Sequence, residues 1–145
     1  IIPTYNEEKY IQSCILALKN QDYKRKYEII VSDGGSKDNT VKIAKRLADK
    51  VIICKKRGIS VGRNAGAKVA GGGILIFVDA DTIVMPNLIS EFVKSLRRKN
   101  VVGVTCPILP FSMEIHHQLF FQLVNLFVKS SIWTKKPGSW NMLWL

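Results

Sequence analysis

Two aspartates separated by a single residue follow the strongest strand-like run of the chain. Asp79 and Asp81 come directly after the apolar residues 74–78, Ile-Leu-Ile-Phe-Val, whose composition predicts a buried strand. Residues i and i+2 at a strand end project to the same side, so the two carboxylates should lie together. Paired carboxylates repel one another and are tolerated best beside a cation, and oxygen-only ligands suit Mg²⁺ or Mn²⁺. The alternative is that Asp81 or Thr82 only caps a helix that starts near Asn87.

Two further polar segments also follow predicted strands. Residues 3–8 (Pro-Thr-Tyr-Asn-Glu-Glu) come after Ile1 and Ile2, and residues 32–40 (Ser-Asp-Gly-Gly-Ser-Lys-Asp-Asn-Thr) come after the apolar run 27–31. One interpretation is ordinary turn chemistry that leads into a helix N-cap. The other is a ligand site, because glycines let a backbone approach a ligand closely and a helix N-terminus favours phosphate.

Strand-like runs alternate with helical patterns along the chain, joined by short connections. Such repeated β-α units predict an α/β fold, a three-layer α/β/α sandwich around a mostly parallel, Rossmann-like sheet. Ligands of these sheets bind outside the carboxyl ends of the strands, where the three polar segments fall. The predicted helices are 6–18, 40–47, 60–70 and 87–96, and the predicted strands are 1–2, 27–31, 51–54, 74–78 and 101–105.

Four segments, taken together, resemble the inverting family 2 glycosyltransferases of GT-A fold. These segments are 2–8, 31–40, 62–67 (Gly-Arg-Asn-Ala-Gly-Ala) and 77–82 (Phe-Val-Asp-Ala-Asp-Thr). The last one is similar to the DxD element of that family, and the order and spacing match over roughly residues 1–105. The resemblance implies a GT-A core for binding a nucleotide-sugar over residues 1–110. Residues 111–145 would then hold an amphipathic helix and the start of an acceptor-side region.

The resemblance also implies roles for residues of the first two segments. Pro3, Thr4 and Glu7 would line the nucleoside pocket, and Asp33 would hydrogen-bond the base. The donor would be a nucleotide-diphospho-sugar. The form Asp-Gly-Gly-Ser resembles the subset of the family that works on lipid-linked or cell-envelope glycans, so a glycan or lipid-linked acceptor is expected.

The other two segments would hold the diphosphate and its metal ion. The resemblance places Arg63 and Asn64 where the family reaches the ribose or diphosphate, Asp79 on the ribose or metal, and Asp81 on the divalent ion, Mg²⁺ or Mn²⁺. Glycosyl transfer expels a nucleoside diphosphate, and a metal ion neutralises the charge that develops on this leaving group.

The family's catalytic base is a downstream carboxylate, usually in an acidic pair. After Asp81 the chain has only Glu91 and Glu114, and neither lies in a matching motif. We therefore assign no base and expect the sequence to be a piece of the catalytic domain, truncated within the first strand.

The segment 112–133 carries a wide apolar face opposite a polar stripe. A buried amphipathic helix is one interpretation, and an interfacial helix beside a lipid-phosphate acceptor is the other. His116 and His117, on this segment, are interpreted as surface or cap residues and not as ligands. The apolar face comprises Leu119, Phe120, Leu123, Val124, Phe127 and Val128, and the polar stripe comprises Gln118, Gln122, Asn125 and Lys129.

The formal charge of +11 fits a phosphate-bearing substrate, nucleic acid, an acidic membrane surface or a solvated basic face. The competing function is a nucleotide-binding or nucleic-acid-binding module without transferase activity. However, the GxGxxG of a dinucleotide domain is not present, and the aromatic residues lie in apolar runs, so we expect no nucleic-acid partner. The cysteines Cys14, Cys54 and Cys106 read as reduced, buried thiols. They favour a cytoplasmic protein, with peripheral contact at the inner face of the membrane as a further expectation.

Overall fold

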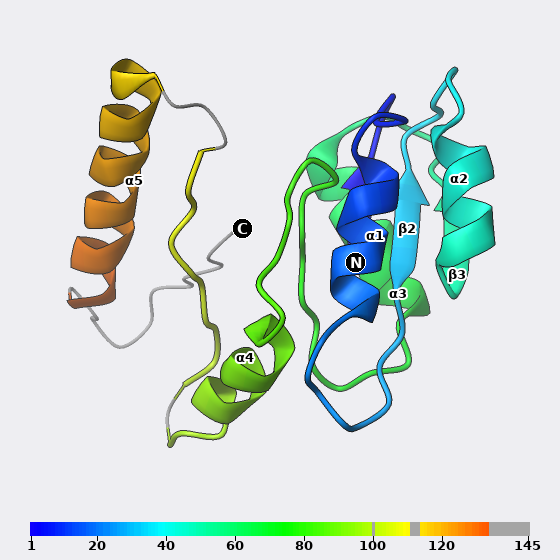
Figure 1. Cartoon of the computed structure of the whole chain (residues 1–145). Coiled ribbons are helices and arrows are strands. Elements are labelled where there is room, and N and C mark those ends of the chain that lie inside the picture. Colours follow the sequence, from blue (N-terminus) through cyan, green and yellow to red (C-terminus); the bar gives the residue numbers. More distant parts are fainter. Residues whose placement is uncertain (100, 111–113, 134–145) are drawn as a thin grey trace. The chain divides into compact units, whose positions relative to one another are not determined.

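The computed structural model describes residues 1–99, 101–110 and 114–133 (Figure 1). The chain divides into two compact units, Ile1–Lys99 and Asn100–Leu145, which we describe separately. The division of function at residue 110 that the sequence suggests stays a prediction.

A parallel sheet lies at the centre of the first unit. Strands β1 (Ile2–Thr4), β2 (Ile30–Asp33) and β3 (Lys50–Ile53) lie in the order β1-β2-β3, and every pairing is parallel. Thr4 pairs with Asp33, and Asp33 pairs with Ile53. The three strands therefore end at the same edge, and the loops that follow them start side by side.

The apolar run 74–78 lies beside Ile1 without becoming an assigned strand. The backbone nitrogen of Ile1 donates to the carbonyl of Ile76 at 2.8 Å, and the backbone N–H of Val78 donates to the carbonyl of Ile1 at 3.1 Å. This pair of bonds is the pattern of a parallel ladder. The predicted strand is thus reduced to one rung beside β1, which still brings Asp79 to the shared edge of the sheet.

Helices cover both faces of the sheet, as the sequence predicts. Helices α1 (Ile11–Lys19) and α2 (Thr40–Leu47) lie side by side, and α3 (Ile59–Val69) contacts β1 and β2 (Figure 1). Alternate strand residues point to opposite faces. Ile2 and Val31 belong to the core cluster that includes the apolar face of α1, whereas Pro3 and Ser32 are the neighbours of Gly62 on α3. The three-layer α/β/α arrangement is confirmed.

The first helix starts five residues later than the predicted 6–18. Asn6 has a φ of 57°, a left-handed backbone conformation that cannot lie inside a right-handed helix. A turn follows, in which the N–H groups of Tyr10 and Ile11 both donate to the carbonyl of Glu7. The segment 6–10 is therefore a loop.

Helix α4 (Leu88–Leu96) begins with Asn87 as its N-cap residue. Neither Asp81 nor Thr82 is that cap, so the capping alternative for Asp81 is wrong. Among the cysteines, Cys14 is buried as predicted, while Cys54 and Cys106 are half-buried, and all three are free thiols.

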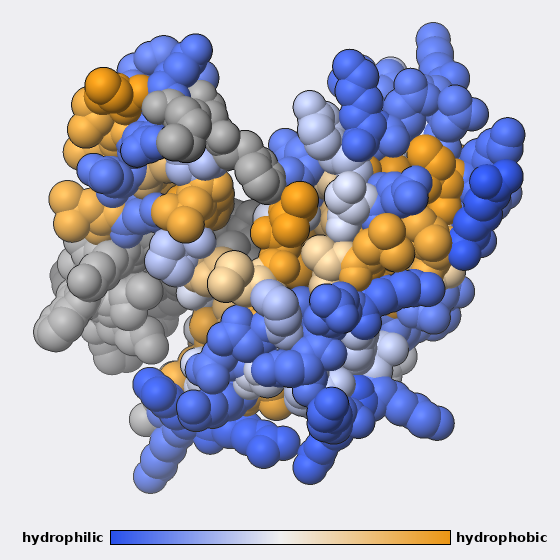
Figure 2. All heavy atoms as spheres, in the orientation of Figure 1, coloured by the Kyte–Doolittle hydropathy of each residue, from blue (hydrophilic) through white to orange (hydrophobic). Residues whose placement is uncertain are grey.

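In the second unit, helix α5 (Ile115–Trp133) follows an extended segment. The side-chain amide of Asn125 accepts from the backbone N–H of Ile108 at 3.0 Å and donates to its carbonyl at 2.8 Å. The strand predicted over 101–105 does not form, and Val102 there is 91% exposed. Figure 2 shows apolar side chains on the surface of α5 beside polar ones. In the part of the chain described, we find no helix long and apolar enough to cross a membrane.

Candidate functional site

A cavity of about 370 Å³ opens at the edge of the sheet where the strands end. Its lining combines carboxylates, backbone of the strand-end loops, one aromatic ring and one guanidinium. Pro3, Thr4, Glu7, Asp79 and Asp81, all singled out from the sequence, are brought together here. The described lining residues are Pro3, Thr4, Tyr5, Glu7, Ser32, Gly34, Arg57, Gly58, Ile59, Gly62, Asp79, Ala80 and Asp81.

Asp33 is fully buried, and donors from its own surroundings bind its carboxylate. One oxygen accepts from the backbone N–H groups of Gly35 and Ser36, each at 2.8 Å. The other accepts from the hydroxyl of Thr4 at 3.1 Å and from the hydroxyl of Ser36. A carboxylate has about four acceptor sites, and these four donors fill them. In this structure, Asp33 fixes the loop after β2 and joins it to β1.

The loops after β1 and β2 are joined by reciprocal hydrogen bonds. The backbone N–H of Asn6 donates to the hydroxyl of Ser36 at 2.8 Å, while the side-chain oxygen of Asn6 accepts from the N–H of Lys37 at 2.9 Å. The backbone N–H of Glu7 donates to the hydroxyl of Thr40 at 2.8 Å. Polar side chains of each loop therefore accept hydrogen bonds from backbone N–H groups of the other loop, about thirty residues away in the sequence.

The same pattern continues at the next residues of both loops. The backbone N–H of Glu8 donates to Asp38 at 3.1 Å, and a carboxylate oxygen of Glu8 accepts from the backbone and side chain of Asn39. Asp38 also accepts from the backbone N–H of Thr40, the first residue of α2, at 3.0 Å, while Asn39 is the N-cap residue of that helix. Hydrogen bonds thus join the two loops along residues 6–8 and 36–40.

Arg63 reaches the edge of the sheet from α3 and holds Asp79. Its Nη2 lies 2.9 Å from Oδ1 of Asp79, and the Arg63 side chain is only 9% exposed. Helix α3 approaches β1 closely because Gly62 and Gly66 face the strand. A Cβ on Gly66 would clash with the side chain of Ile1.

Burial and neighbouring negative charges raise the pKa of two carboxyl groups in the cavity, Glu7 and Asp79. Burial raises the pKa of Glu7, and the negative charges of Asp81, Asp38 and Asp79 raise it further. Burial also raises the pKa of Asp79, Arg63 opposes this rise, and the charge of Asp81 adds to it. Three carboxylates from two loops thus line one cavity, with more negative charge than Arg63 neutralises. Carboxylate oxygens are ligands that suit Mg²⁺ or Mn²⁺.

Tyr5 and Arg57, which contact each other, are among the lining residues that were not predicted as site residues. The guanidinium carbon of Arg57 lies 3.7 Å from the ring centroid of Tyr5, a cation–π contact. Tyr5 belongs to the strand-end motif 3–8, and Arg57 belongs to a basic run that follows β3. The rule that ligands meet the carboxyl ends of strands, applied to β3 as well, would have indicated the basic run 55–57 as a whole.

Three predicted site residues lie outside the described lining: Arg63, which reaches it through its ion pair with Asp79, Asn64 and Asp33. Asn64 is exposed on α3, one residue beyond Arg63, and Asp33 is bound within its own loop. Glu91 lies on α4 and pairs with Lys94 at 3.6 Å. Glu114 belongs to the second unit.

Comparison with known proteins identifies the family to which this chain belongs. A family model described as "Glycosyl transferase family 2" matches residues 1–138. The chain belongs to glycosyltransferase family 2. The chain spans about a quarter to a third of the length of the curated relatives it matches.

One curated relative of this glycosyltransferase family 2 chain comes from Methanococcus voltae and is 35% identical over 106 residues. It is "Dolichyl N-acetyl-alpha-D-glucosaminyl phosphate 3-beta-D-2,3-diacetamido-2,3-dideoxy-beta-D-glucuronosyltransferase", and the match covers 68% of this chain and 33% of the relative.

Two solved structures show the same GT-A fold. Staphylococcus aureus TarS in complex with UDP is 27% identical with a TM-score of 0.60, and the match covers 74% of this chain and 37% of TarS. The mannosyltransferase PcManGT from Pyrobaculum calidifontis, in complex with GDP-Man and Mn²⁺, is 30% identical with a TM-score of 0.64. That match covers 69% of this chain and 32% of PcManGT.

Proposed function

We propose that this chain binds a nucleotide-diphospho-sugar together with Mg²⁺ or Mn²⁺, as the donor side of a glycosyltransferase. The observation that carries the proposal is the meeting of Glu7, Asp79 and Asp81 in one cavity at the carboxyl ends of parallel strands. A nucleoside diphosphate is repelled by such carboxylates unless a divalent cation lies between the two. The cavity therefore selects a metal-bound diphosphate.

The two aspartates have different tasks in this proposal. Asp81 is exposed and serves as the metal ligand. Asp79 is held by Arg63 at 2.9 Å, so its second oxygen is aimed by the ion pair at the ribose or the metal. When bound, the metal neutralises charge on the departing diphosphate. Arg63 acts through Asp79. Asn64 is exposed on α3 outside the described lining, and its contact with the ribose or diphosphate is a proposal that rests on the family resemblance alone.

The nucleoside occupies the part of the cavity formed by Pro3, Thr4 and Glu7. Asp33, which would recognise the base, anchors the wall of this pocket through Thr4. A base reaches Asp33 only by replacing one of its present donors.

The acceptor is a lipid-linked or cell-envelope glycan. Support comes from the Methanococcus voltae relative, a dolichyl-phosphate glycan transferase, and from TarS, a poly(ribitol-phosphate) β-N-acetylglucosaminyltransferase. This acceptor class fits a cytoplasmic enzyme that meets the membrane peripherally. We assign the catalytic base to no residue of the 145.

A thermal-shift series tests the donor proposal. The chain is heated with UDP-, GDP- or dTDP-sugars, each in Mn²⁺ and again in chelator. A ligand that binds only the folded state raises its stability, by about 2.7 kcal/mol at a hundredfold excess over Kd. We expect a rise for at least one nucleotide that is larger with Mn²⁺. A folded sample that responds to none of them would overturn the proposal.

A further inference from the structure

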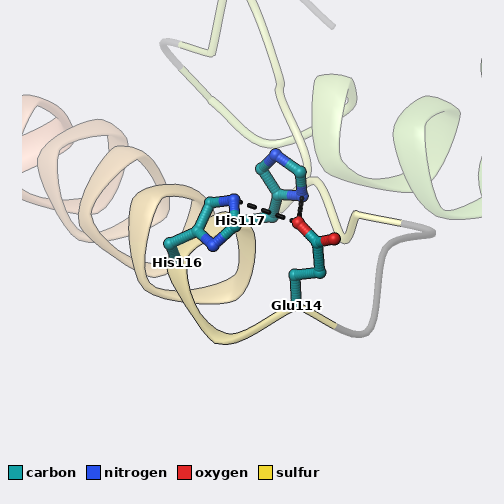
Figure 3. Close-up of side chains that lie close together, drawn as sticks. All are labelled: Glu114, His116 and His117. Atoms are coloured by element: carbon teal, nitrogen blue, oxygen red, sulfur yellow. Dashed lines mark ion pairs between the residues drawn. The ribbon is translucent and has the colours of Figure 1, made fainter.

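A second group of ligand-type side chains lies in the other compact unit, at the start of α5. Glu114 precedes the helix, and His116 and His117 belong to its first turn (Figure 3). One ligand atom from each of these residues lies within 4.8 Å of the others. Figure 3 shows both imidazole rings turned toward the carboxylate of Glu114.

The distances in this group are close to those of a coordination shell. Nε2 of His116 lies 3.1 Å from Oε2 of Glu114, and Nδ1 of His117 lies 3.5 Å from the same oxygen. Zinc takes imidazole nitrogen at about 2.0–2.1 Å and carboxylate oxygen at about 2.0–2.2 Å in tetrahedral geometry, which places neighbouring ligands about 3.3 Å apart. Both observed separations differ from this value by only a few tenths of an ångström.

The backbone of α5 positions all three ligands within four residues. The N–H of Gln118 donates to the carbonyl of Glu114 at 3.1 Å, so Glu114 is tied to the first turn that carries both histidines. One helical turn therefore brings the three side chains together.

Two imidazoles and one carboxylate differ in chemistry from the oxygen-only cavity of the first unit. Imidazole suits Zn²⁺, Co²⁺ and Ni²⁺, whereas carboxylates without nitrogen suit Mg²⁺ and Mn²⁺. The side chains of Glu114, His116 and His117 are 63%, 72% and 49% exposed. Three protein ligands with solvent access leave a fourth position open to water or to an anionic oxygen of a ligand.

We propose that Glu114, His116 and His117 form a second, open metal site that takes Zn²⁺. This assignment revises the prediction that both histidines are only surface or cap residues. It is independent of the donor proposal, because it needs no nucleotide and no residue of the first cavity.

Isothermal titration of the full chain with Zn²⁺, without nucleotide, tests the site. The chain contains only these two histidines, so any imidazole contribution comes from them. The titration uses a background in which Cys54 and Cys106 are replaced by serine. Cys14 can stay, since its side chain is buried in the core of the first unit and is not accessible to added metal.

We expect the variants Glu114→Gln, His116→Gln and His117→Gln each to weaken Zn²⁺ binding at least tenfold. Glu91→Gln, which removes a carboxylate from α4, should leave Zn²⁺ affinity unchanged. The three target side chains are exposed, so their replacement should leave folding intact. If the three variants bind Zn²⁺ as the background does, or if the background binds none, the group is a surface cluster of ion pairs and the proposal is wrong.

Discussion

The guanidinium of Arg63 holds the carboxylate of Asp79 at 2.9 Å, although the two residues come from a helix and from a loop sixteen positions apart. The Arg63 side chain is almost buried while Asp79 is 44% exposed. One end of the pair is therefore fixed by packing, and the other faces the cavity.

This pair should show a measurable energetic coupling. We expect Arg63→Met to reduce the free energy of unfolding by about 1–3 kcal/mol, because Asp79 loses a charged partner. In the Asp79→Asn background the same change should cost less, since no carboxylate is left uncompensated. Urea unfolding of both single variants and the double variant gives the coupling energy. Strictly additive losses would show that the ion pair contributes nothing beyond its parts.

Asp81→Asn should separate metal binding from folding. Asparagine keeps the size and turn-forming ability of aspartate but removes its charge, so metal-dependent nucleotide binding should fall at least about tenfold, roughly 1.4 kcal/mol. Stability without metal should change little or rise slightly, because one repulsive charge is gone. A nucleotide titration in Mn²⁺, repeated in chelator, measures the effect, with Glu91→Gln as the matched control. Equal metal-dependent affinity in Asp81→Asn and wild type would contradict the role of Asp81.

The raised pKa of Glu7 and that of Asp79 predict how stability depends on pH. Their ordinary values are 4.5 and 3.8, so in the window above these values the folded state holds protons that the unfolded state has lost. Stability from these groups is present below that window and declines as the pH rises through it. Mn²⁺ should reduce the decline, because the ion compensates the ionised carboxylates.

Urea midpoints between about pH 4 and pH 7, in chelator and in Mn²⁺, measure this dependence. The difference between wild type and the Glu7→Gln, Asp79→Asn double variant isolates the two groups from other carboxylates such as Asp38, whose pKa is lowered. A difference that grows in favour of wild type as the pH rises would have the wrong sign for the proposal.

Gly66 should tolerate no side chain. A Cβ at this position would clash with Ile1, and overpacking of this kind costs about 1–3 kcal/mol. Alanine favours a helix by up to about 1 kcal/mol relative to glycine, which offsets only part of that cost. Thermal unfolding of Gly66→Ala should therefore shift to lower temperature. Gly73→Ala is the control, since a Cβ there has no neighbour within 4 Å, and equal behaviour of the two variants would refute the packing argument.

Much of this architecture could be predicted from the sequence, because helix periodicity is a local property. The predicted helix 40–47 agrees with α2, and the others agree closely except for the start of α1. A strand depends instead on its neighbours. The run 74–78, the strongest strand pattern, has one rung beside Ile1, and the pattern at 101–105 forms no strand among the described residues.

The site shows the same division between local and long-range information. The i, i+2 spacing placed Asp79 and Asp81 correctly on one cavity. It could not show that four donors saturate Asp33, because one of them, Thr4, lies 29 residues away. The sequence also could not show which residue of the basic run 55–57 reaches Tyr5. That depends on the path of the loop through Gly58, whose φ of 146° favours glycine.

Arg57 is the residue of the basic run that contacts Tyr5, and this contact leads to a prediction about donor binding. Arg57 is the basic side chain among the described residues that line the cavity, so it can approach the phosphates of a bound nucleotide or cover the ring of Tyr5. Removing it should weaken nucleotide diphosphate binding about three- to tenfold, roughly 0.7–1.4 kcal/mol, with a smaller loss at high salt because the charge is exposed.

Three variants at this run distinguish charge from stacking. Arg57→Ala removes both, and Arg57→Lys keeps the charge but loses the planar group that stacks on the ring. Lys55→Ala removes an equivalent charge from the same loop outside the described lining. If charge acts, Arg57→Lys binds the nucleotide like wild type; if stacking acts, it binds like Arg57→Ala. In both cases Lys55→Ala should bind more tightly than Arg57→Ala, because a charge outside the lining acts on the nucleotide from farther away and is screened more strongly. Equal losses in Lys55→Ala and Arg57→Ala would mean that the basic run acts only through its net charge, and that the contact with Tyr5 has no part in binding.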